Sequence, residues 1–426
     1  MNKKVELLAP AGNYDKMLTA FRYGADAVYL GGNAFGLRAK ADNLTDGQIE
    51  AAVKYANSLG KKIYVTANII SRDADLPPIA EYAKFLESAG VHGVIVADIG
   101  TFMVIKEAAP CLPIHVSTQA NNLNWKTIDF WLKNGATRVN LARELSLEEI
   151  KGINYNLLLN NPELAEAEEP YLEAFVHGAM CMSYSGRCML SDYLAERSSN
   201  RGDCAQPCRW NYNLVEEKRP GEYIPVFENE RGTFIFNSKD LCMLEYLPDI
   251  INCGVGSLKI EGRMKSEFYT ATTVRAYRVA LDACLEDPEG FRNNDALKKE
   301  LMEELLSCSH RDYYTGFYFG GKGKQIYGSS SYKKNTDFIG CTDSCEAVGD
   351  KLYRLGFKLR GAFNEGERLE IISPDVAFVR EFTVTGLKNG EGESISRAAN
   401  AMMEVTMDVP FSVAEGSMIR RRTGRG

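Results

Sequence analysis

Residues 5–32 read VELLAPAGNYDKMLTAFRYGADAVYLGG, two short apolar runs separated by a helical pattern. The same unit recurs through the first 180 residues. Apolar positions at three- and four-residue spacing mark the helical segments, for example residues 46–58 and 80–89. The seven apolar runs are Val5–Ala9, Ala27–Leu30, Lys62–Ala67, Gly93–Ala97, Ile114–Ser117, Arg138–Leu141 and Glu173–Val176. Strands that alternate with helices predict a parallel sheet.

An eighth run, Ser257–Ile260, would complete a (β/α)8 TIM-like barrel, and we predict this α/β fold. An open doubly wound sheet is the alternative. In a barrel, the carboxyl ends of the strands face one mouth, where barrel enzymes carry out their chemistry. The polar residues at those predicted ends are Asn68, Asp98, Gln119, Asn121, Arg143, Glu144, His177, Lys259, Glu261 and Arg263. Several of them can instead cap the helices that follow.

The pattern changes after residue 332 to short alternating runs separated by Gly, Asn and Asp. Such runs are typical of a small all-β domain. We therefore expect residues 1–332 to form the barrel, with a cysteine-rich loop at about residues 177–242. Residues 333–426 are expected to form a small C-terminal β-barrel.

The composition, 45% hydrophobic and 25% charged, is that of a folded globular protein. No leader pattern and no apolar stretch of about 18 residues is present, so we expect a cytoplasmic protein that does not span a membrane. The formal net charge of -7 means that an RNA partner needs a local basic patch. The first candidates for it are Arg420, Arg421, Arg422 and Arg425, and the second are Lys322, Lys324, Lys333 and Lys334.

The densest chemical signal is a cysteine pattern, Cys181-x6-Cys188-x15-Cys204-x3-Cys208, with Cys242 further along the chain. In a reducing compartment, clustered thiols are more often metal ligands or catalytic groups than disulfides. Thiolates bind both iron-sulfur clusters and zinc, but the lack of Cys-x2-Cys knuckles favours iron-sulfur. Buried, unreactive thiols are the third interpretation. It is favoured for the isolated Cys111, Cys253, Cys284 and Cys308.

Hydrolytic signatures are absent from the sequence, which has neither a His-Glu-x-x-His motif nor a Gly-x-Ser-x-Gly elbow. Only four histidines occur, so a triad would have to be assembled from distant residues. One of them, His177, lies at a predicted strand end beside the cysteine cluster. We predict a role for it in the site.

Seven segments of the chain are similar to the collagenase-like peptidase family, peptidase family U32. They are LLAPAGN, AVYLGG, VSTQANN, EAFVHGAMCMSYSGRC, NRGDCAQPCRW, NSKDLC and SLKIEGRMKS. The region after residue 333 also resembles the C-terminal domain of longer members. For the branch of matching length, the resemblance implies oxygen-independent hydroxylation of the wobble uridine of tRNA to 5-hydroxyuridine, with prephenate as co-substrate. The family leaves two alternatives, a peptidase and a cluster-bearing subunit that needs a homologous partner.

The resemblance also implies a [4Fe-4S] cluster on Cys181, Cys188 and Cys204. Cys242 is the preferred fourth ligand and Cys208 the alternative. An anticodon loop is already single-stranded, so its base can enter the barrel mouth. Cations that can pair with the two carboxylates of prephenate are Arg38, Arg143, Lys259 and Arg263, each of which can instead form an ion pair with Glu144 or Glu261. The predicted catalytic residues are His177, Lys239, Asp240 and Glu261.

Overall fold

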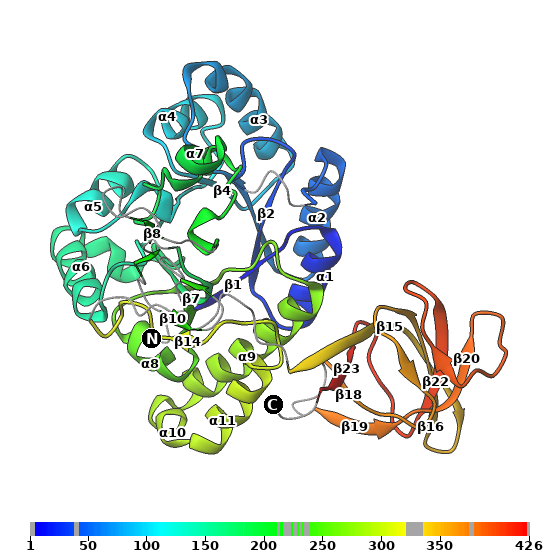
Figure 1. The fold of residues 1–426 in the computed structure, drawn as a ribbon. Coiled ribbons are helices and arrows are strands. Elements are labelled where there is room, and N and C mark those ends of the chain that lie inside the picture. The colour runs from blue at the N-terminus through cyan, green and yellow to red at the C-terminus, as the bar shows by residue number, and fades with distance from the viewer. Residues whose placement is uncertain are drawn as a thin grey trace.

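The computed structural model describes residues 5–37, 42–181, 183–210, 214–215, 223–224, 228–229, 232–233, 239–320, 335–374 and 379–423. Its larger part is a closed barrel of eight parallel strands inside a ring of helices (Figure 1). The strands are β1 (Glu6–Pro10), β2 (Ala27–Gly31), β3 (Lys62–Ala67), β4 (Gly93–Val96), β5 (Ile114–Val116), β6 (Arg138–Asn140), β7 (Leu172–Ala179) and β13 (Ser257–Ile260). Because β13 pairs with both β1 and β7, the sheet is closed. The predicted barrel is confirmed, and the open doubly wound sheet is excluded.

The ring of helices follows the predicted alternation with the strands. Its members are α1 (Tyr14–Arg22), α2 (Asp46–Ser58), α3 (Leu76–Ser88), α4 (Ile99–Ala108), α5 (Trp125–Lys133), α6 (Leu147–Asn160), α8 (Leu247–Asn252) and α9 (Glu267–Glu286), with α10 (Pro288–Asn293) and α11 (Asp295–Leu305) packed outside α9. Side-chain caps define the starts of several helices. Asn13 accepts from the Lys16 amide, and Asp98 accepts from the Thr101 amide. Among the described residues, no helix combines the length and apolar character needed to cross a membrane.

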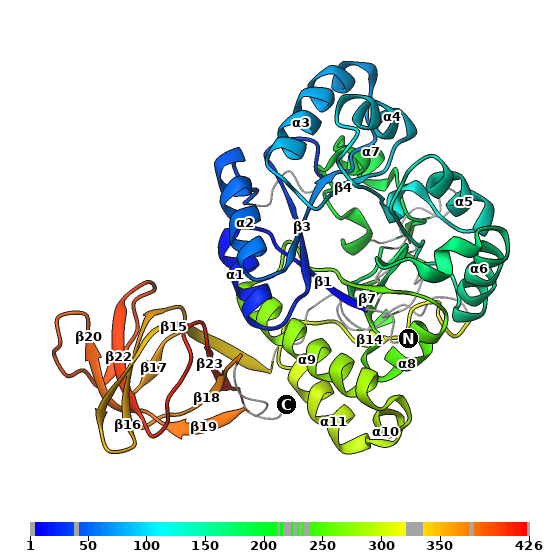
Figure 2. The same cartoon turned by 180° about the vertical axis from the view of Figure 1, so that it is seen from behind.

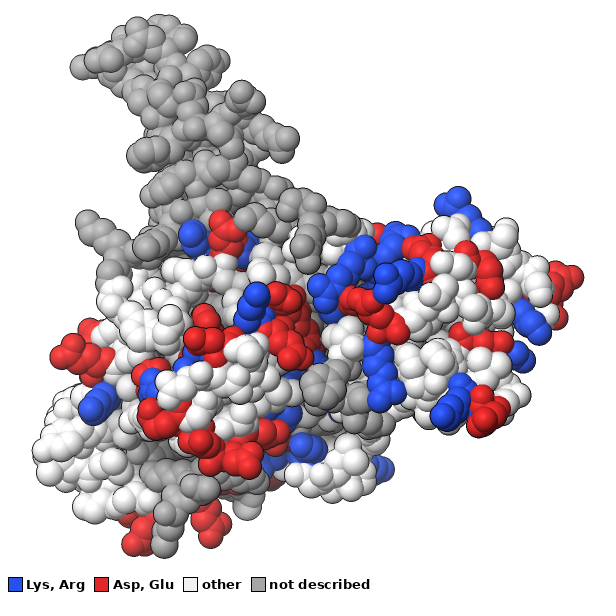
Figure 3. Space-filling model, turned by 90° about the horizontal axis from the view of Figure 1, so that it is seen from below, with Lys and Arg blue, Asp and Glu red and all other residues white. Residues whose placement is uncertain are grey.

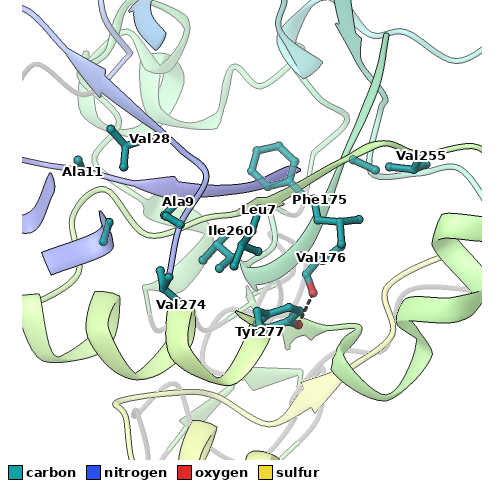
Figure 4. Packing of buried hydrophobic residues seen from close by; sticks show 14 of the residues in the cluster. Leu7, Ala9, Ala11, Val28, Phe175, Val176, Val255, Ile260, Val274 and Tyr277 are labelled. Atoms are coloured by element: carbon teal, nitrogen blue, oxygen red, sulfur yellow. Dashed lines mark hydrogen bonds between the residues drawn. The ribbon is translucent and has the colours of Figure 1, made fainter. Parts of the chain in front are cut away.

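Alternate residues of each strand face either the helices or the barrel interior. Leu7 and Ile260 point outward and pack against Val274 and Tyr277 of α9 (Figure 4). Glu6 and Lys259, one residue away from them in sequence, are also buried, but they pair with other charged side chains inside the barrel. The hydrophobic core therefore lies mainly between the sheet and the helices. The barrel interior combines buried charged side chains with a small apolar cluster of Leu8, Ala27, Tyr29, Tyr64 and Ile95.

Strand β7 is longer than the sequence pattern predicts, because it continues past Val176 to Ala179. The extra length is paired with the antiparallel β12 (Asp240–Cys242), which in turn pairs with β14 (Tyr313–Tyr314). These two strands extend the barrel sheet on the side of α9 and α11. As a result, residues 177–179 of β7 are paired strand and not a strand end.

Between β7 and β12 the described elements are short. They are the helix α7 (Leu190–Ala195) and the strand pairs β8 (Leu214–Val215) with β9 (Tyr223–Ile224) and β10 (Glu228–Asn229) with β11 (Gly232–Thr233). Figures 1 and 2 both place α7 within the ring of helices, beside α4.

The C-terminal part is a seven-stranded antiparallel sheet in the order β19-β18-β23-β15-β16-β22-β20. Its strands are β15 (Thr336–Gly349), β16 (Leu352–Leu359), β18 (Arg368–Ile372), β19 (Arg380–Thr383), β20 (Thr385–Asn389), β22 (Glu404–Val409) and β23 (Met418–Arg422), with the separate pair β17 (Phe363–Asn364) and β21 (Arg397–Ala398). The all-β character is as predicted. Among the described residues, the end strands β19 and β20 are not paired with each other, so the sheet is open.

The basic run near the C-terminus is a strand of this sheet and not a solvated tail. Arg420 is buried in β23, where it forms an ion pair with Glu370 and donates to Ser307 Oγ of the barrel at 2.8 Å. Arg421 pairs with Asp337, and Arg422 pairs with Glu370. The expectation of a free basic patch at residues 420–422 is therefore wrong, because neighbouring carboxylates already neutralise these cations. Figure 3 shows basic and acidic side chains intermingled over the face it presents.

The C-terminal sheet is fixed to the barrel through buried groups. Tyr23, the C-cap residue of α1, donates to the carbonyl of Ile372 at 2.8 Å, and Phe268 of α9 stacks on Phe338 of β15. Thr336 donates to the carbonyl of Ser307 across the same interface. Because these polar groups are buried, separating the two parts would leave them without partners.

Candidate active site at the barrel mouth

Arg143 is the central cation of the barrel mouth. It follows β6, and its guanidinium lies over the ring of Phe175 at 3.8 Å. One terminal nitrogen donates to the carbonyl of Ala179 at 2.8 Å, and the other lies 3.7 Å from a carboxylate oxygen of Glu261. The Nε atom is buried and has no hydrogen-bond partner among the described residues. The guanidinium of Arg143 is therefore held over the Phe175 ring, and its Nε donor is left for a ligand.

Lys259 and Arg263 extend this cluster along β13 and the loop after it. Lys259 Nζ donates to Glu173 at 2.7 Å and lies over the ring of Tyr29 at 4.5 Å. Arg263 is buried and donates to Thr66 Oγ1 at 3.1 Å and to Asn43 Oδ1 at 2.6 Å. The structure thus brings Arg143, Lys259 and Arg263 to the same end of the barrel.

Glu261 lies beside these cations. Its carboxylate is 3.4 Å from the hydroxyl of Tyr29, whose proton is donated to the carbonyl of Ile260 at 3.0 Å. The side chain keeps partial exposure, 18%, so it can be reached by a ligand. Of the four predicted catalytic residues, Glu261 is the one that these contacts place among the mouth cations.

Four residues of the mouth escaped the sequence analysis: Tyr29, Asn43, Thr66 and Phe175. Three of them lie on strands and point inward, and this alternation is the signal that could have found them. Gly31 marks the same place. A Cβ atom there would come within 2.2 Å of Arg263 Nη2, so the Arg263 side chain needs glycine at this position.

A buried ion network supports the mouth from below. Arg138 pairs with Glu6 at 2.5 Å and with Glu173 at 3.4 Å, and Glu173 in turn holds Lys259. Burial raises the pKa of Glu6, but the charge and hydrogen bonds of Arg138 outweigh this effect, so the pKa lies below its usual range. The network keeps Lys259 in one position.

His177 lies outside the mouth. Its ring is buried between Tyr269, Tyr277 and Tyr313 on the side of α9, and its Nδ1 atom is 3.3 Å from the Tyr277 hydroxyl. Burial lowers the pKa of His177 to about 3, so the imidazole is neutral at ordinary pH. The structure therefore separates His177 from Arg143 and Glu261.

Asp240 lies behind the same strand. It is buried and accepts two hydrogen bonds from the Arg311 guanidinium, at 2.7 and 3.0 Å. Burial raises the pKa of Asp240, but the charge of Arg311 outweighs this effect and lowers it. Lys239 is partly buried immediately before β12. These contacts place Asp240 in a structural ion pair, away from the mouth cations.

The candidate cluster ligands are dispersed over two environments. Cys181 is exposed just after β7, and Cys188, Cys204 and Cys208 are partly buried in the loop that follows. Cys242 is buried in β12, with its sulfur 3.7 Å from the Tyr277 hydroxyl and 3.8 Å from Met302 Sδ. Burial raises the pKa of the Cys242 thiol to about 11.

Thiols are the right donors for an iron-sulfur cluster. Within the described ranges, however, no three His, Cys, Asp or Glu side chains lie close enough together to hold a metal ion. The described side chains therefore do not by themselves form the predicted cluster site.

The loop that carries these cysteines lies across the barrel mouth. In its described part, residues 183–210, the amide of Ser185 donates to Glu144 at 2.9 Å. Arg201 forms a bidentate ion pair with Asp75 after β3. The carbonyl of Asn200 accepts from the Ile70 amide. We call residues 183–210 the cysteine loop. It is attached to the loops that follow at least two different strands.

Some predicted residues lie outside the described residues. They are Arg38, Arg425 and the lysines Lys322, Lys324, Lys333 and Lys334.

Comparison with known sequences identifies the family. The sequence model of peptidase family U32 matches residues 12–327, and that of the peptidase family U32 C-terminal domain matches residues 334–420. The chain belongs to peptidase family U32. Both the barrel and the C-terminal sheet of this U32 protein therefore have counterparts in the family, as the resemblance of the sequence implied.

Individual relatives of this U32 protein carry two kinds of name. It is 37% identical to tRNA hydroxylation protein P1 of Bacillus subtilis, over 99% of this chain and 96% of the relative. It is 35% identical to tRNA hydroxylation protein P of Escherichia coli, over 96% and 94%. A protein named collagenase from Porphyromonas gingivalis is 30% identical, over 77% of this chain and 78% of the relative.

Proposed function

We propose that this protein hydroxylates the wobble uridine of cytoplasmic tRNA to 5-hydroxyuridine, with prephenate as co-substrate and a [4Fe-4S] cluster as cofactor. The observation that carries the proposal is similarity over nearly the whole chain, the C-terminal sheet included, to two proteins named for tRNA hydroxylation. The partner would be the anticodon loop, whose unpaired base can leave its stack at small cost.

The mouth supports an anionic co-substrate. Three cations, Arg143, Lys259 and Arg263, lie with two carboxylates, Glu173 and Glu261. The free donor of Arg143 and its fixed guanidinium plane suit a carboxylate, which binds such a plane in bidentate fashion. The excess of one positive charge among these five side chains favours an anionic ligand such as prephenate.

We assign the roles of the chain's own side chains from these contacts. Arg143 binds and orients a carboxylate of the co-substrate, and Phe175 holds Arg143 in its plane. Arg263 provides the second cation, fixed by Thr66 and Asn43. Glu261, beside Arg143 and Tyr29, accepts a proton released at the reacting base.

We propose that the cluster is held by Cys181, Cys188 and Cys204, with Cys242 or Cys208 as the fourth ligand. Protein purified without oxygen should contain about four irons per chain and be brown. Cys181→Ser should lose most of the iron. The matched control is Cys284→Ser in α9, where the thiol is buried away from the loop and should not affect iron content. Stoichiometric zinc in place of iron would contradict the assignment.

A peptidase is the second candidate, because a relative named collagenase covers most of the barrel. The described side chains give it little support. His115, His177 and His310 are buried, and His92 is partly exposed, with its Nδ1 atom accepting from the Ile63 amide, so only His92 is open to solvent. Cleavage of gelatin by the purified protein, persisting after iron removal, would favour the peptidase.

The proposal is tested by mass analysis of tRNA nucleosides. Deletion of the gene should remove 5-hydroxyuridine and nucleosides derived from it, and expression of this chain should restore them. Unchanged nucleosides in the deletion strain would contradict the proposal. Restoration only together with a second family member would show that the chain is one subunit of a heteromeric hydroxylase.

A further inference from the structure

The outer face of the cysteine loop carries an unusual set of exposed side chains. Tyr193 is 88% exposed and Met189 is 71% exposed. These two residues are four apart at α7, so they lie on one face of the helix. Tyr184 and Trp210, at the two ends of the loop, are 57% and 44% exposed. Met189 and Tyr193 thus form an exposed apolar pair on one face of α7, and contiguous exposed apolar surface is typical of binding sites.

The position of this face is fixed by the body of the loop. Ser191 of α7 accepts from the Ala205 amide, which ties the helix to the segment that leads to Trp210. The loop itself is attached to the barrel rim through Ser185–Glu144 and Arg201–Asp75. The loop that carries the exposed aromatic rings is therefore fixed to the rim at the carboxyl ends of the barrel strands, the same end as Arg143.

Most charged side chains of the described loop are engaged with one another or with the barrel, and the exposed cation that remains, Arg187, can contact an anionic group. Arg197 pairs with Asp203, Arg201 pairs with Asp75, and Asp192 accepts from the Ser199 amide. Two exposed charged side chains of the described loop have no ion-pair partner among the described residues, Arg187 and Glu196. Arg187 lies in the turn that begins at Tyr184, next to the aromatic face. Glu196 lies at the opposite end of α7.

We propose that this face binds the single-stranded loop of an RNA, with bases stacked on Tyr193 and its aromatic neighbours and a phosphate paired with Arg187. Tyrosine and tryptophan rings stack on any base, and a nearby arginine adds phosphate contact. The inference rests on the proposed function and deepens it, because it assigns the surface that presents the substrate to the mouth. The C-terminal arginines, which are already paired, are not needed for this contact.

The test is RNA binding measured separately from hydroxylation. A fluorescently labelled anticodon stem-loop is titrated with the full-length protein and with Tyr193→Ala, Arg187→Gln and Glu196→Gln. Tyr155→Ala is the matched control, because Tyr155 is 66% exposed on α6 of the outer wall. We expect Tyr193→Ala to weaken binding about tenfold. Arg187→Gln should reduce the slope of log K against log salt by about one, Glu196→Gln should leave affinity unchanged or raise it, and the control should bind as the original protein does.

Equal affinity of Tyr193→Ala and the control would overturn the proposal. A loss in Tyr193→Ala with an unchanged salt slope in Arg187→Gln would support base stacking on Tyr193 and overturn the phosphate contact of Arg187. The proposed function itself is tested by a different experiment, the nucleoside analysis, in which unchanged nucleosides in the deletion strain would contradict it. If the original protein hydroxylates tRNA and the Tyr193→Ala variant binds the stem-loop with the same affinity as the original, this inference is disproved and the proposed function stands.

Discussion

Phe175 and His177 are two residues apart on β7, yet they belong to different regions of the molecule. Phe175 faces the barrel interior and carries Arg143, whereas His177 faces α9 and is enclosed by tyrosines. In a regular strand, residues two apart face the same side. Here the register between β13 and β7 shifts. Lys259 is opposite Phe175, but Ile260, one residue further along β13, is opposite His177, two residues further along β7. The extra residue in β7, Val176, reverses the alternation as a β-bulge does.

The two sides of β7 therefore have different chemistry. The inner side has cations beside a partly exposed carboxylate, which is the arrangement of a ligand site. The outer side has a neutral imidazole and a buried ion pair, Asp240–Arg311, enclosed by protein. We propose that the inner side binds the ligand and that the outer side holds β12 and α9 in place, with Cys242 of β12 as a candidate cluster ligand on that side.

The largest effect should come from the outer side, and on stability. Asp240→Ala leaves the buried Arg311 without its carboxylate, which should cost about 3–5 kcal/mol in the free energy of unfolding. Replacing both partners, with Asp240→Leu and Arg311→Met, should recover most of the loss and restore hydroxylation. Denaturant unfolding and nucleoside analysis measure the two properties. A double variant that is stable but inactive would give Asp240 a catalytic role.

A smaller effect should appear in the pH dependence of stability. The unfolded chain protonates His177 below about pH 6.5, but the folded protein does so only near pH 3. Stability should therefore fall as the pH falls from 6.5 toward 3, by about 2 kcal/mol at pH 5 for this group. His177→Phe should lack this part of the pH dependence and keep its activity. An equal dependence in both proteins would mean that His177 is not buried in its neutral form.

The smallest effect should come from the ring beneath Arg143. Phe175→Leu removes a cation–π contact worth about 1 kcal/mol, so the KM for prephenate should rise about fivefold. Tyr277→Phe is the control on the outer side. It removes the hydrogen bond to the Val176 carbonyl and the one from the Met243 amide, and it should lower stability by about 1–3 kcal/mol without changing KM. Similar changes of KM in both variants would remove the distinction between the two sides.

The sequence predicted the barrel because each strand-helix unit carries its own pattern, and all eight strands lie where the apolar runs indicated. It also placed Arg143, Lys259, Arg263 and Glu261 near one another, since they follow or end parallel strands. It could not place His177, because neither the bulge at Val176 nor the pairing of β7 with the distant β12 has a local signal.

The prediction of a free basic patch at residues 420–422 was wrong for a similar reason. Read alone, three consecutive arginines resemble a solvated tail. Their partners Asp337 and Glu370 lie on other strands, more than 45 positions away in the chain, so the pairing is set by tertiary structure. Burial of Arg420 against Ser307 likewise depends on the docking of the two parts.

One measurement tests the central claim that the inner side of β7 is the active side. Arg143→Gln and His177→Phe are expressed separately in the deletion strain, at equal levels, and 5-hydroxyuridine is measured in total tRNA. We predict that Arg143→Gln restores less than about one hundredth of the nucleoside, since a charged contact to a bound carboxylate is lost, and that His177→Phe restores it fully. Full restoration by Arg143→Gln together with failure of His177→Phe would contradict the account and move the active site to the outer side of the strand.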